Sequence, residues 1–230
     1  MATRNRLKHI VAQTLSISNR EAISLVYDKR ITINNQTGTI QQLVSPEDEI
    51  CLDGNIIRPG KKIIYLAYHK PRGVESTFNR NIVNNLHHHI HLPEDVFYLG
   101  RLDKESEGLM IFTNNGKLHD KILREDYNRE KEYVVVVNKP ITAEFIEKMH
   151  LGIRILGKIT KPAKVFQENE ITFRIILTQG MNRQIRRMCY KCGYEVITLK
   201  RTAIAGIQLG DLSVNEIRNL TSDEERLLKN

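Results

Sequence analysis

GRLDKESEGLMIFTNNG, residues 100–116, joins a charged turn to an apolar run that is typical of a buried strand. The turn sets the carboxylate of Asp103 beside an arginine, immediately before the run LMIFT at 109–113. Glycines at both ends, Gly100 and Gly108, permit a tight backbone and the close approach of a ligand. Taken alone, an aspartate in such a turn is better explained as a cap or turn residue, so the rest of the chain has to decide its function.

The segments around this turn alternate between strands and helices without a regular order. β-Branched and apolar runs predict strands, in addition to 109–113, at 63–71, 133–139 and 171–177. Helices are expected at 116–124 and at 142–149, the second with Thr142 as its N-cap. Strands interrupted irregularly by helices favour an α+β fold over a repeating βαβ array.

The first 60 residues are expected to form a separate small domain. Apolar residues at helical spacing predict two short helices, and Ser18 with Glu21 form a capping box that starts the second. The alternating run RITINN then predicts a strand. We therefore expect two domains, residues 1–60 and 63–230, with a linker at 59–62.

Basic charge is concentrated in two parts of the chain. The 230 residues carry 35 Lys and Arg against 27 Asp and Glu, a formal net charge of +8. Residues 1–62 contribute +3 and residues 178–201 contribute +5, so the remainder is neutral. Clustering of one sign is typical of a surface that binds phosphates, and a basic strip without a ligand is the alternative.

Other features exclude several classes of protein. No apolar run approaches the roughly 18 residues of a membrane span, and the N-terminus lacks the apolar segment of a secretory signal. We therefore expect no membrane partner, and because three cysteines cannot form a disulfide framework, we expect a cytoplasmic protein. Cys189 and Cys192 have ligand spacing, but zinc needs a second pair and only Cys51 remains. The histidines at 87–91 are interpreted as a solvated loop, so no metal and no cofactor are expected.

Four stretches together resemble the RNA pseudouridine synthases. Residues 100–114 match the family signature GRLDxx[ST]xGLLLLTN. HKPRG at 69–73 is similar to the family's NKPxG turn, KEYVV at 131–135 to the strand that carries an active-site aromatic, and residues 178–201 to its C-terminal basic motif. His69 in place of Asn and Ser106 in place of Thr depart from the usual pattern without removing a catalytic group.

The first 60 residues resemble the S4 RNA-binding domain in Arg6-Leu7, SNREA at 18–22 and YDKRITINN at 27–35. This is the architecture of the RsuA branch of the family, and the resemblance covers essentially the whole chain. It implies an S4-like domain followed by an α+β catalytic domain with a mixed, mainly antiparallel sheet and flanking helices. Phrases such as EKEYVV and GMNRQIRRMC are most similar to members that modify large-subunit (23S) rRNA.

The resemblance implies isomerisation of a uridine to pseudouridine in structured RNA, with the target base flipped into a pocket. Asp103 would be the catalytic aspartate, acting at the sugar or at the base, and Arg186 the cation that keeps it ionised. Tyr133 would stack on the flipped base, and its hydroxyl could move a proton at C5. Leu199 would form an apolar wall of the same pocket.

Further side chains are expected to bind the RNA. In the S4-like domain these are Arg6, Lys8, Arg20, Lys29 and Arg30, and in the catalytic domain Lys70, Arg101, Arg183, Gln184 and Arg187. A monomer acting on 23S rRNA is expected, and a tRNA anticodon loop stays open as an additional substrate.

Three other interpretations stay open at this point. The substrate could be small-subunit rRNA, or the chain could be a noncatalytic RNA-binding or ribosome-assembly factor. The intact GRLD and the retained Tyr133 argue against a noncatalytic factor. A phosphate-ester hydrolase would need metal ligands or a pair of carboxylates that the sequence does not supply.

Overall fold

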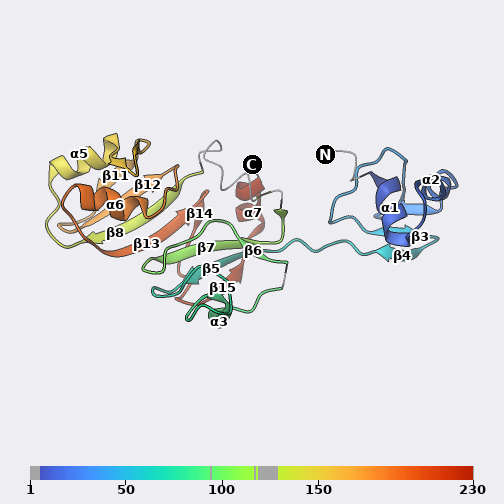
Figure 1. Cartoon of the computed structure of the whole chain (residues 1–230), viewed down its shortest axis with the longest axis horizontal. Helices are drawn as coiled ribbons and strands as arrows, with labels where there is room; N and C mark the ends of the chain where they lie inside the picture. The colour runs from blue at the N-terminus through green and yellow to red at the C-terminus, as the bar shows by residue number, and fades with distance from the viewer. Residues whose placement is uncertain (1–5, 94, 117, 119–128, 230) are drawn as a thin grey trace. The chain divides into compact units, whose positions relative to one another are not determined.

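The computed structural model describes residues 6–93, 95–116, 118 and 129–229. Contacts divide the chain into two compact units, Met1–Ile63 and Ile64–Asn230, which are described separately (Figure 1). The division falls next to the linker expected at 59–62. Within the described ranges, no helix has the length and apolar character needed to cross a membrane.

The first unit packs two short helices against a small antiparallel sheet of strand order β2-β1-β3-β4. As expected, the Ser18 hydroxyl accepts from the Glu21 backbone and the Glu21 carboxylate accepts in return from Ser18. Leu7, Val11 and Ile31 are completely buried in its core. The elements are α1 (Leu7–Leu15), α2 (Asn19–Tyr27), β1 (Ile31–Ile33), β2 (Gln36–Thr37), β3 (Ile50–Leu52) and β4 (Asn55–Arg58).

The second unit contains the remaining elements. Its first strands and helix are β5 (Tyr65–Lys70), α3 (Leu86–His89), β6 (Phe97–Tyr98), β7 (Glu107–Thr113) and β8 (Lys131–Val137). Its middle part is α5 (Ala143–Leu151), β9 (Arg154–Ile155), β10 (Lys158–Ile159), β11 (Lys164–Gln167) and β12 (Thr172–Leu177). Its last part is α6 (Gln184–Lys191), β13 (Val196–Ile204), β14 (Ile207–Gln208), β15 (Ile217–Asn219) and α7 (Ser222–Lys229).

A nine-stranded sheet organises this unit, with the path β11-β12-β8-β13-β7-β5-β15 and with β14 and β6 at its sides. Among the described residues β13 and β7 pair in parallel and the other neighbours are antiparallel, which confirms an α+β fold with a mixed, mainly antiparallel sheet. The strands expected from the apolar runs correspond to β5, β7, β8 and β12. Thr142 caps α5 by accepting from Phe145 N at 3.2 Å, whereas most of the helix expected at 116–124 lies outside the described residues.

One face of this sheet is covered in two places. At one end α5 and α6 lie against β8, β12 and β13 (Figure 1), where Phe145, Met188 and Val135 share a core. At the other end Tyr68 of β5 and Phe112 of β7 pack with α3 and its neighbouring loops. Tyr133 contacts both cores. Between these two covered ends, part of the same face of the sheet lines a cavity.

Candidate active site

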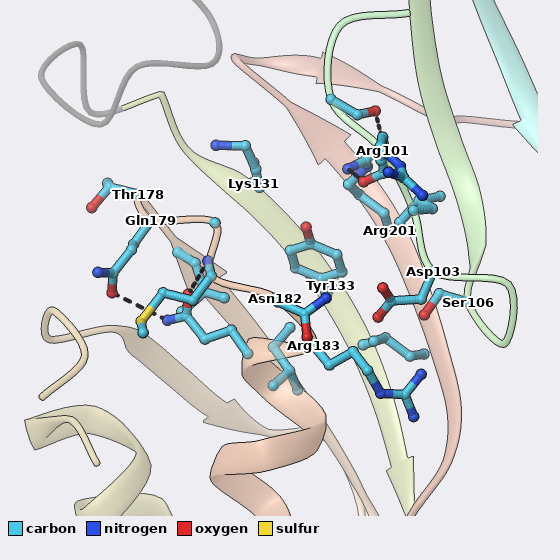
Figure 2. Close-up of a pocket in the computed structure, with 18 of the residues that line it drawn as sticks. Arg101, Asp103, Ser106, Lys131, Tyr133, Thr178, Gln179, Asn182, Arg183 and Arg201 are labelled. Carbon is cyan, nitrogen blue, oxygen red and sulfur yellow. Dashed lines mark hydrogen bonds between the residues drawn. The ribbon is translucent and has the colours of Figure 1, made fainter. Parts of the chain in front are cut away.

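A cavity of about 560 Å³ opens over this face of the sheet (Figure 2). Tyr133 of β8 lies directly opposite Ile175 of β12 and Arg201 of β13, and opposed residues project from the same face. Because side chains alternate along a strand, Leu199 of β13 also faces this side. Tyr133, Leu199 and Arg201 line the cavity, together with Asp103 from the loop before β7 and with the loop before α6.

Gly108 lets two strands meet beside the cavity. It lies opposite Arg201 in the parallel β7–β13 pair and has φ +112°. A Cβ atom at this position would lie 2.6 Å from Arg201 N and closer still to Arg201 O. The sequence indicated that Gly108 permits the close approach of a ligand, but in the structure the close neighbour is the adjacent strand β13. This pairing places Arg201 under the loop that carries Asp103.

Hydrogen bonds to its carbonyl groups hold the loop before β7. Every carbonyl from residue 100 to residue 105 accepts one. The guanidinium of Arg201 donates to the carbonyls of residues 100 and 101, and the Ser76 hydroxyl donates to Leu102 O at 2.6 Å. Asp103 O accepts from Ser106 N at 3.0 Å, and the next carbonyl, Lys104 O, accepts from Gly73 N at 2.7 Å. The last carbonyl accepts from Arg186 at 2.7 Å. A loop with this many anchors holds its side chains in a defined direction.

The Asp103 side chain is left free for chemistry by this arrangement. It is half-buried, and in the described part of the chain its carboxylate makes no hydrogen bond or ion pair. Figure 2 shows the carboxylate projecting into the cavity toward the ring of Tyr133. Burial lowers the pKa of both Lys70 and Arg186, and the negative charge of Asp103 partly offsets this shift in each, so two cations lie within its electrostatic reach. An available carboxylate in a cationic pocket is suited to act at an electron-poor carbon.

Lys70 does not have the role expected from the sequence. Its side chain is completely buried, and Nζ donates to Pro71 O at 2.9 Å and to Val74 O at 2.7 Å. Burial, with a smaller contribution from Arg201, lowers the pKa of Lys70 to about 8. The expectation that Lys70 contacts RNA is therefore wrong, because no phosphate can reach an amine that is enclosed and bonded to the turn it stabilises.

Arg186 lies near Asp103 without pairing to it. Its guanidinium donates to Glu105 O at 2.7 Å and to Val196 O at 3.2 Å, and no ion pair joins it to Asp103 within the described residues. Burial, followed by the charge of Arg183, lowers the pKa of Arg186, and Asp103 opposes this shift. The expected cation is thus near Asp103 without a direct pair, because both terminal nitrogens of its guanidinium donate to backbone carbonyls.

The loop before α6 carries three more of the expected residues. Gln184 is buried: its Oε1 accepts from Met181 N at 3.0 Å, so it supports the loop and offers no free surface to RNA. Arg183 is exposed and lines the cavity with φ +50°. Arg187 donates to Asn182 O at 3.1 Å and lies outside this cavity. Arg101 is exposed at the cavity on the other side of Asp103.

The five basic residues expected to bind RNA near the N-terminus belong to the first compact unit. Arg6 and Lys8 lie at the start of α1, and Arg20 near the start of α2. Lys29 and Arg30 form the turn before β1, where the Arg30 guanidinium is bonded to Asp53 at 2.5–3.2 Å. This hydrogen bond lowers the pKa of Asp53, and it makes Arg30 a structural partner more than a free phosphate ligand.

No group of three His, Cys, Asp or Glu side chains placed to hold a metal occurs in the described ranges. The thiol of Cys189 is buried, which raises its pKa, and Cys192 is half-buried. In the histidine patch, His89 contacts Asn84 Oδ1 at 2.7 Å and Asn215 Oδ1 at 3.2 Å. These side chains are therefore engaged in local packing and hydrogen bonding.

The fold and the cavity define the class of protein. The family model described as RNA pseudouridylate synthase matches residues 64–191, a range that contains Asp103, Tyr133 and Arg186. The chain belongs to this family and is an enzyme that isomerises uridine to pseudouridine in RNA. The interpretations as a hydrolase or as a noncatalytic factor are thereby set aside.

Particular relatives refine this assignment to the RsuA-type branch. The chain is 42% identical over 221 residues to the dual-specificity RNA pseudouridine synthase RluF of Escherichia coli K12, covering 95% of this chain and 76% of RluF. It is 32% identical over 235 residues to ribosomal large subunit pseudouridine synthase B of Bacillus subtilis 168, covering 97% and 95%. A crystal structure of a pseudouridylate synthase has the same fold, with a TM-score of 0.69, 24% identity and coverage of 97% and 99%.

Sequence reasoning missed two residues that hold the loop of Asp103. Ser76 is buried and bonds both to Leu102 N at 3.2 Å and to Leu102 O at 2.6 Å. Arg201 is buried and bonds three carbonyls, including Leu109 O at 2.7 Å. Arg201 ends the basic stretch 178–201 and was read only as one charge among six. Ser76 carries no local signal, because its partner is 26 residues away.

Proposed function

We propose that this enzyme isomerises a uridine of large-subunit rRNA, with Asp103 as the catalytic carboxylate. The observation that carries the proposal is a free carboxylate on a fully bonded loop, directed into the cavity floored by Tyr133. The similarity to RluF and to the large-subunit enzyme of Bacillus subtilis supports the choice of RNA.

The reaction breaks the bond between C1′ of the ribose and N1 of uracil, and it forms a bond between C1′ and C5. The proton on C5 leaves and N1 gains one, so no group or electron is transferred overall. Asp103 acts on the sugar or on the pyrimidine ring, since a carboxylate can be nucleophile or base at either. The anchored loop sets its direction before substrate arrives, which is the main contribution of a preorganised site.

Tyr133 and Leu199 supply the surface that receives the flipped base. The Tyr133 ring stacks on uracil, and its hydroxyl is available for the proton on C5. Leu199 is buried in the cavity wall and excludes water from one side of the base. Arg101 and Arg183 border the same cavity from opposite loops and bind the phosphates next to the target nucleotide.

Arg186 acts as a positioning residue in this scheme. Its bond to Glu105 O holds the loop two residues after Asp103, and its charge stabilises the ionised carboxylate across the intervening space. Substitution to Lys keeps a charge but loses the planar group that spans Glu105 O and Val196 O. We expect Arg186→Lys to lower kcat with little change in KM.

The decisive variant is Asp103→Asn, which keeps the shape of the side chain and removes its charge. We expect pseudouridine formation to fall below detection on a 23S rRNA transcript, while the affinity for that transcript is retained. Asp211→Asn, an exposed residue of the same unit, is the matched control and should retain activity. Normal turnover by Asp103→Asn would refute the assignment of Asp103.

The target RNA is tested by mapping pseudouridines in total RNA from cells with and without the gene. A position lost from 23S rRNA would support the proposed substrate, and an additional loss from a tRNA anticodon loop would establish a second one. A loss confined to small-subunit rRNA would refute it.

We further propose that the first unit is an S4-like RNA-binding domain, with Arg6, Lys8, Arg20 and Lys29 as phosphate contacts. The two helices with basic residues near their starts support this assignment. Deleting residues 1–63 should flatten the dependence of RNA affinity on salt, because each lost phosphate contact removes about 0.7–0.9 from the slope. An unchanged slope would mean that this unit binds something else.

The proposed enzyme is a cytoplasmic monomer. Light scattering during size-exclusion chromatography should give the mass of one chain, 26.6 kDa. Twice that mass would refute the monomer.

A further inference from the structure

Helix α6 exposes a stripe of cations and one aromatic ring. Its buried residues come in pairs, Gln184 with Ile185 and Met188 with Cys189, and these pack on the sheet. Arg187 and Lys191 lie away from these pairs, one turn apart and about 6 Å along the helix axis, and Arg183 is the residue before the helix. Tyr190, in the same stripe, is 74% exposed.

A second cavity of about 560 Å³ lies against this stripe. One wall carries Arg183, Arg187 and Lys191, and Leu156 from the β9–β10 turn is 54% exposed in another. In the described residues the ring and hydroxyl of Tyr190 have no hydrogen bond or ring contact. Two large apolar surfaces thus remain open to water beside a cluster of positive charge, which is the combination that marks a binding surface.

The charge of this cavity selects an anionic partner. Arg183, Arg186, Arg187 and Lys191 line it with Glu195 as its one carboxylate among the described residues. Cations that follow a groove, together with an aromatic face for a base, are how proteins bind single-stranded nucleic acid without reading its sequence.

Arg183 connects this cavity to the active site. It lines both cavities, since it is the residue at which the active-site loop enters α6. This shared residue gives a strand whose uridine occupies the cavity over Tyr133 a cationic route past Arg183 to the second cavity.

We propose that this cavity is a subsite for one unpaired nucleotide adjacent to the flipped uridine. Its base stacks on Tyr190 over Leu156, and the phosphates on either side are held by Arg183, Arg187 and Lys191. We call it the outer subsite. This proposal rests on the proposed function of the chain as an enzyme that flips a uridine out of structured RNA.

The first test uses the full chain and fluorescein-labelled decauridylate, an unstructured strand that requires no knowledge of the target. Tyr190→Ala should weaken binding by roughly tenfold, and Tyr190→Phe should stay within about twofold of the unmodified chain, because stacking needs the ring and not the hydroxyl. Lys191→Ala should lower the salt slope by about 0.7, as expected for one contact with a single strand. Arg226→Ala, an exposed arginine of α7, is the control that should change neither quantity.

Unchanged binding by Tyr190→Ala would overturn the outer subsite, and so would an equal loss in Tyr190→Phe. The variants should fold, because Tyr190 is exposed, and matching circular dichroism spectra will establish this. A second measurement needs no variant: photocrosslinking with 4-thiouridine placed next to the target uridine of a 23S rRNA fragment. A crosslink in the peptide that contains Tyr190 supports the subsite, and crosslinks confined to other peptides overturn it.

The two proposals fail in different ways. If binding of decauridylate depends on Tyr190 but the chain makes no pseudouridine in 23S rRNA, the proposed substrate fails and the subsite stands. If Asp103→Asn abolishes pseudouridine in 23S rRNA while Tyr190→Ala binds normally, the subsite fails and the proposed function stands.

Discussion

Ser76→Ala tests whether the loop of Asp103 owes its position to a residue outside the sequence motifs. The Ser76 hydroxyl is buried, donates to Leu102 O at 2.6 Å and accepts from Leu102 N at 3.2 Å. Alanine leaves both backbone groups of Leu102 without partners in a buried environment. At about 1–3 kcal/mol for each unpaired group, with some relief by relaxation, the free energy of unfolding should fall by about 2–4 kcal/mol.

The measurement is urea unfolding followed by circular dichroism, with turnover measured separately in the absence of urea. A slope near 2 kcal/mol/M converts the expected loss to a midpoint shift of roughly 1–2 M. Because Leu102 directly precedes Asp103, kcat should fall by roughly 10- to 100-fold, the effect of a small misplacement of a reacting group. KM should change little, since the phosphate contacts are untouched.

Ser106→Ala is the matched control for stability. Ser106 is as deeply buried as Ser76, but its hydroxyl has only a long contact, 3.5 Å, with Arg186 in the described residues. It should lose less than about 1 kcal/mol. If the two variants lose equal stability, or if Ser76→Ala keeps the kcat of the unmodified enzyme, the reasoning about the held loop is wrong.

Three other predictions address the framework. Gly108→Ala should lower the free energy of unfolding in urea by about 3 kcal/mol or more, because it combines positive-φ strain with a clash against the Arg201 backbone. Gly157→Ala, at φ +78° with open space around it, should lower it by only about 1 kcal/mol. Equal losses in the two variants would refute the clash. The folded-state pKa of Lys70 is about 8, below the ordinary 10.5, so between these pH values the unfolded chain binds more protons than the folded chain. The free energy of unfolding, measured relative to Lys70→Met, should therefore rise with pH across this window by roughly 3 kcal/mol in total. A difference that does not change with pH would refute this prediction. Thr142→Ala should lower stability by about 1 kcal/mol through loss of the cap on Phe145 N, and Thr142→Ser should restore most of it.

Local pattern was sufficient to predict several of the helices and strands. The Ser18–Glu21 capping box, the Thr142 cap and the strand at 109–113 were all read correctly, because each depends on residues within a few positions of one another. Asp103 was singled out by a contiguous motif. In these cases the residues that form the predictive pattern are the same neighbouring residues that form the structure.

Side-chain roles were read less well where a charge is buried by residues distant in sequence. Lys70 was expected to meet RNA, yet the strands around it enclose it and its turn carbonyls bind it. Arg186 was expected as the cation near Asp103, but its bonds to Glu105 O and Val196 O were not foreseen. The residues next to Lys70 and Arg186 in sequence indicate neither the burial of these side chains nor the backbone carbonyls that they bond.

Motif, periodicity and charge are properties of neighbouring residues, so they were enough to indicate the family and the α+β fold and to single out Asp103 as the candidate catalytic residue. The tertiary structure alone decided how that aspartate is held. Ser76, Arg186 and Arg201 lie 26 to 101 positions from the carbonyl groups that they bond in its loop, and only the folding of the second unit brings them beside that loop. Hydrogen bonds act over about 3 Å in space, whatever the separation along the chain, and this is why a sequence motif points to the proposed catalytic residue and not to the residues that hold its loop.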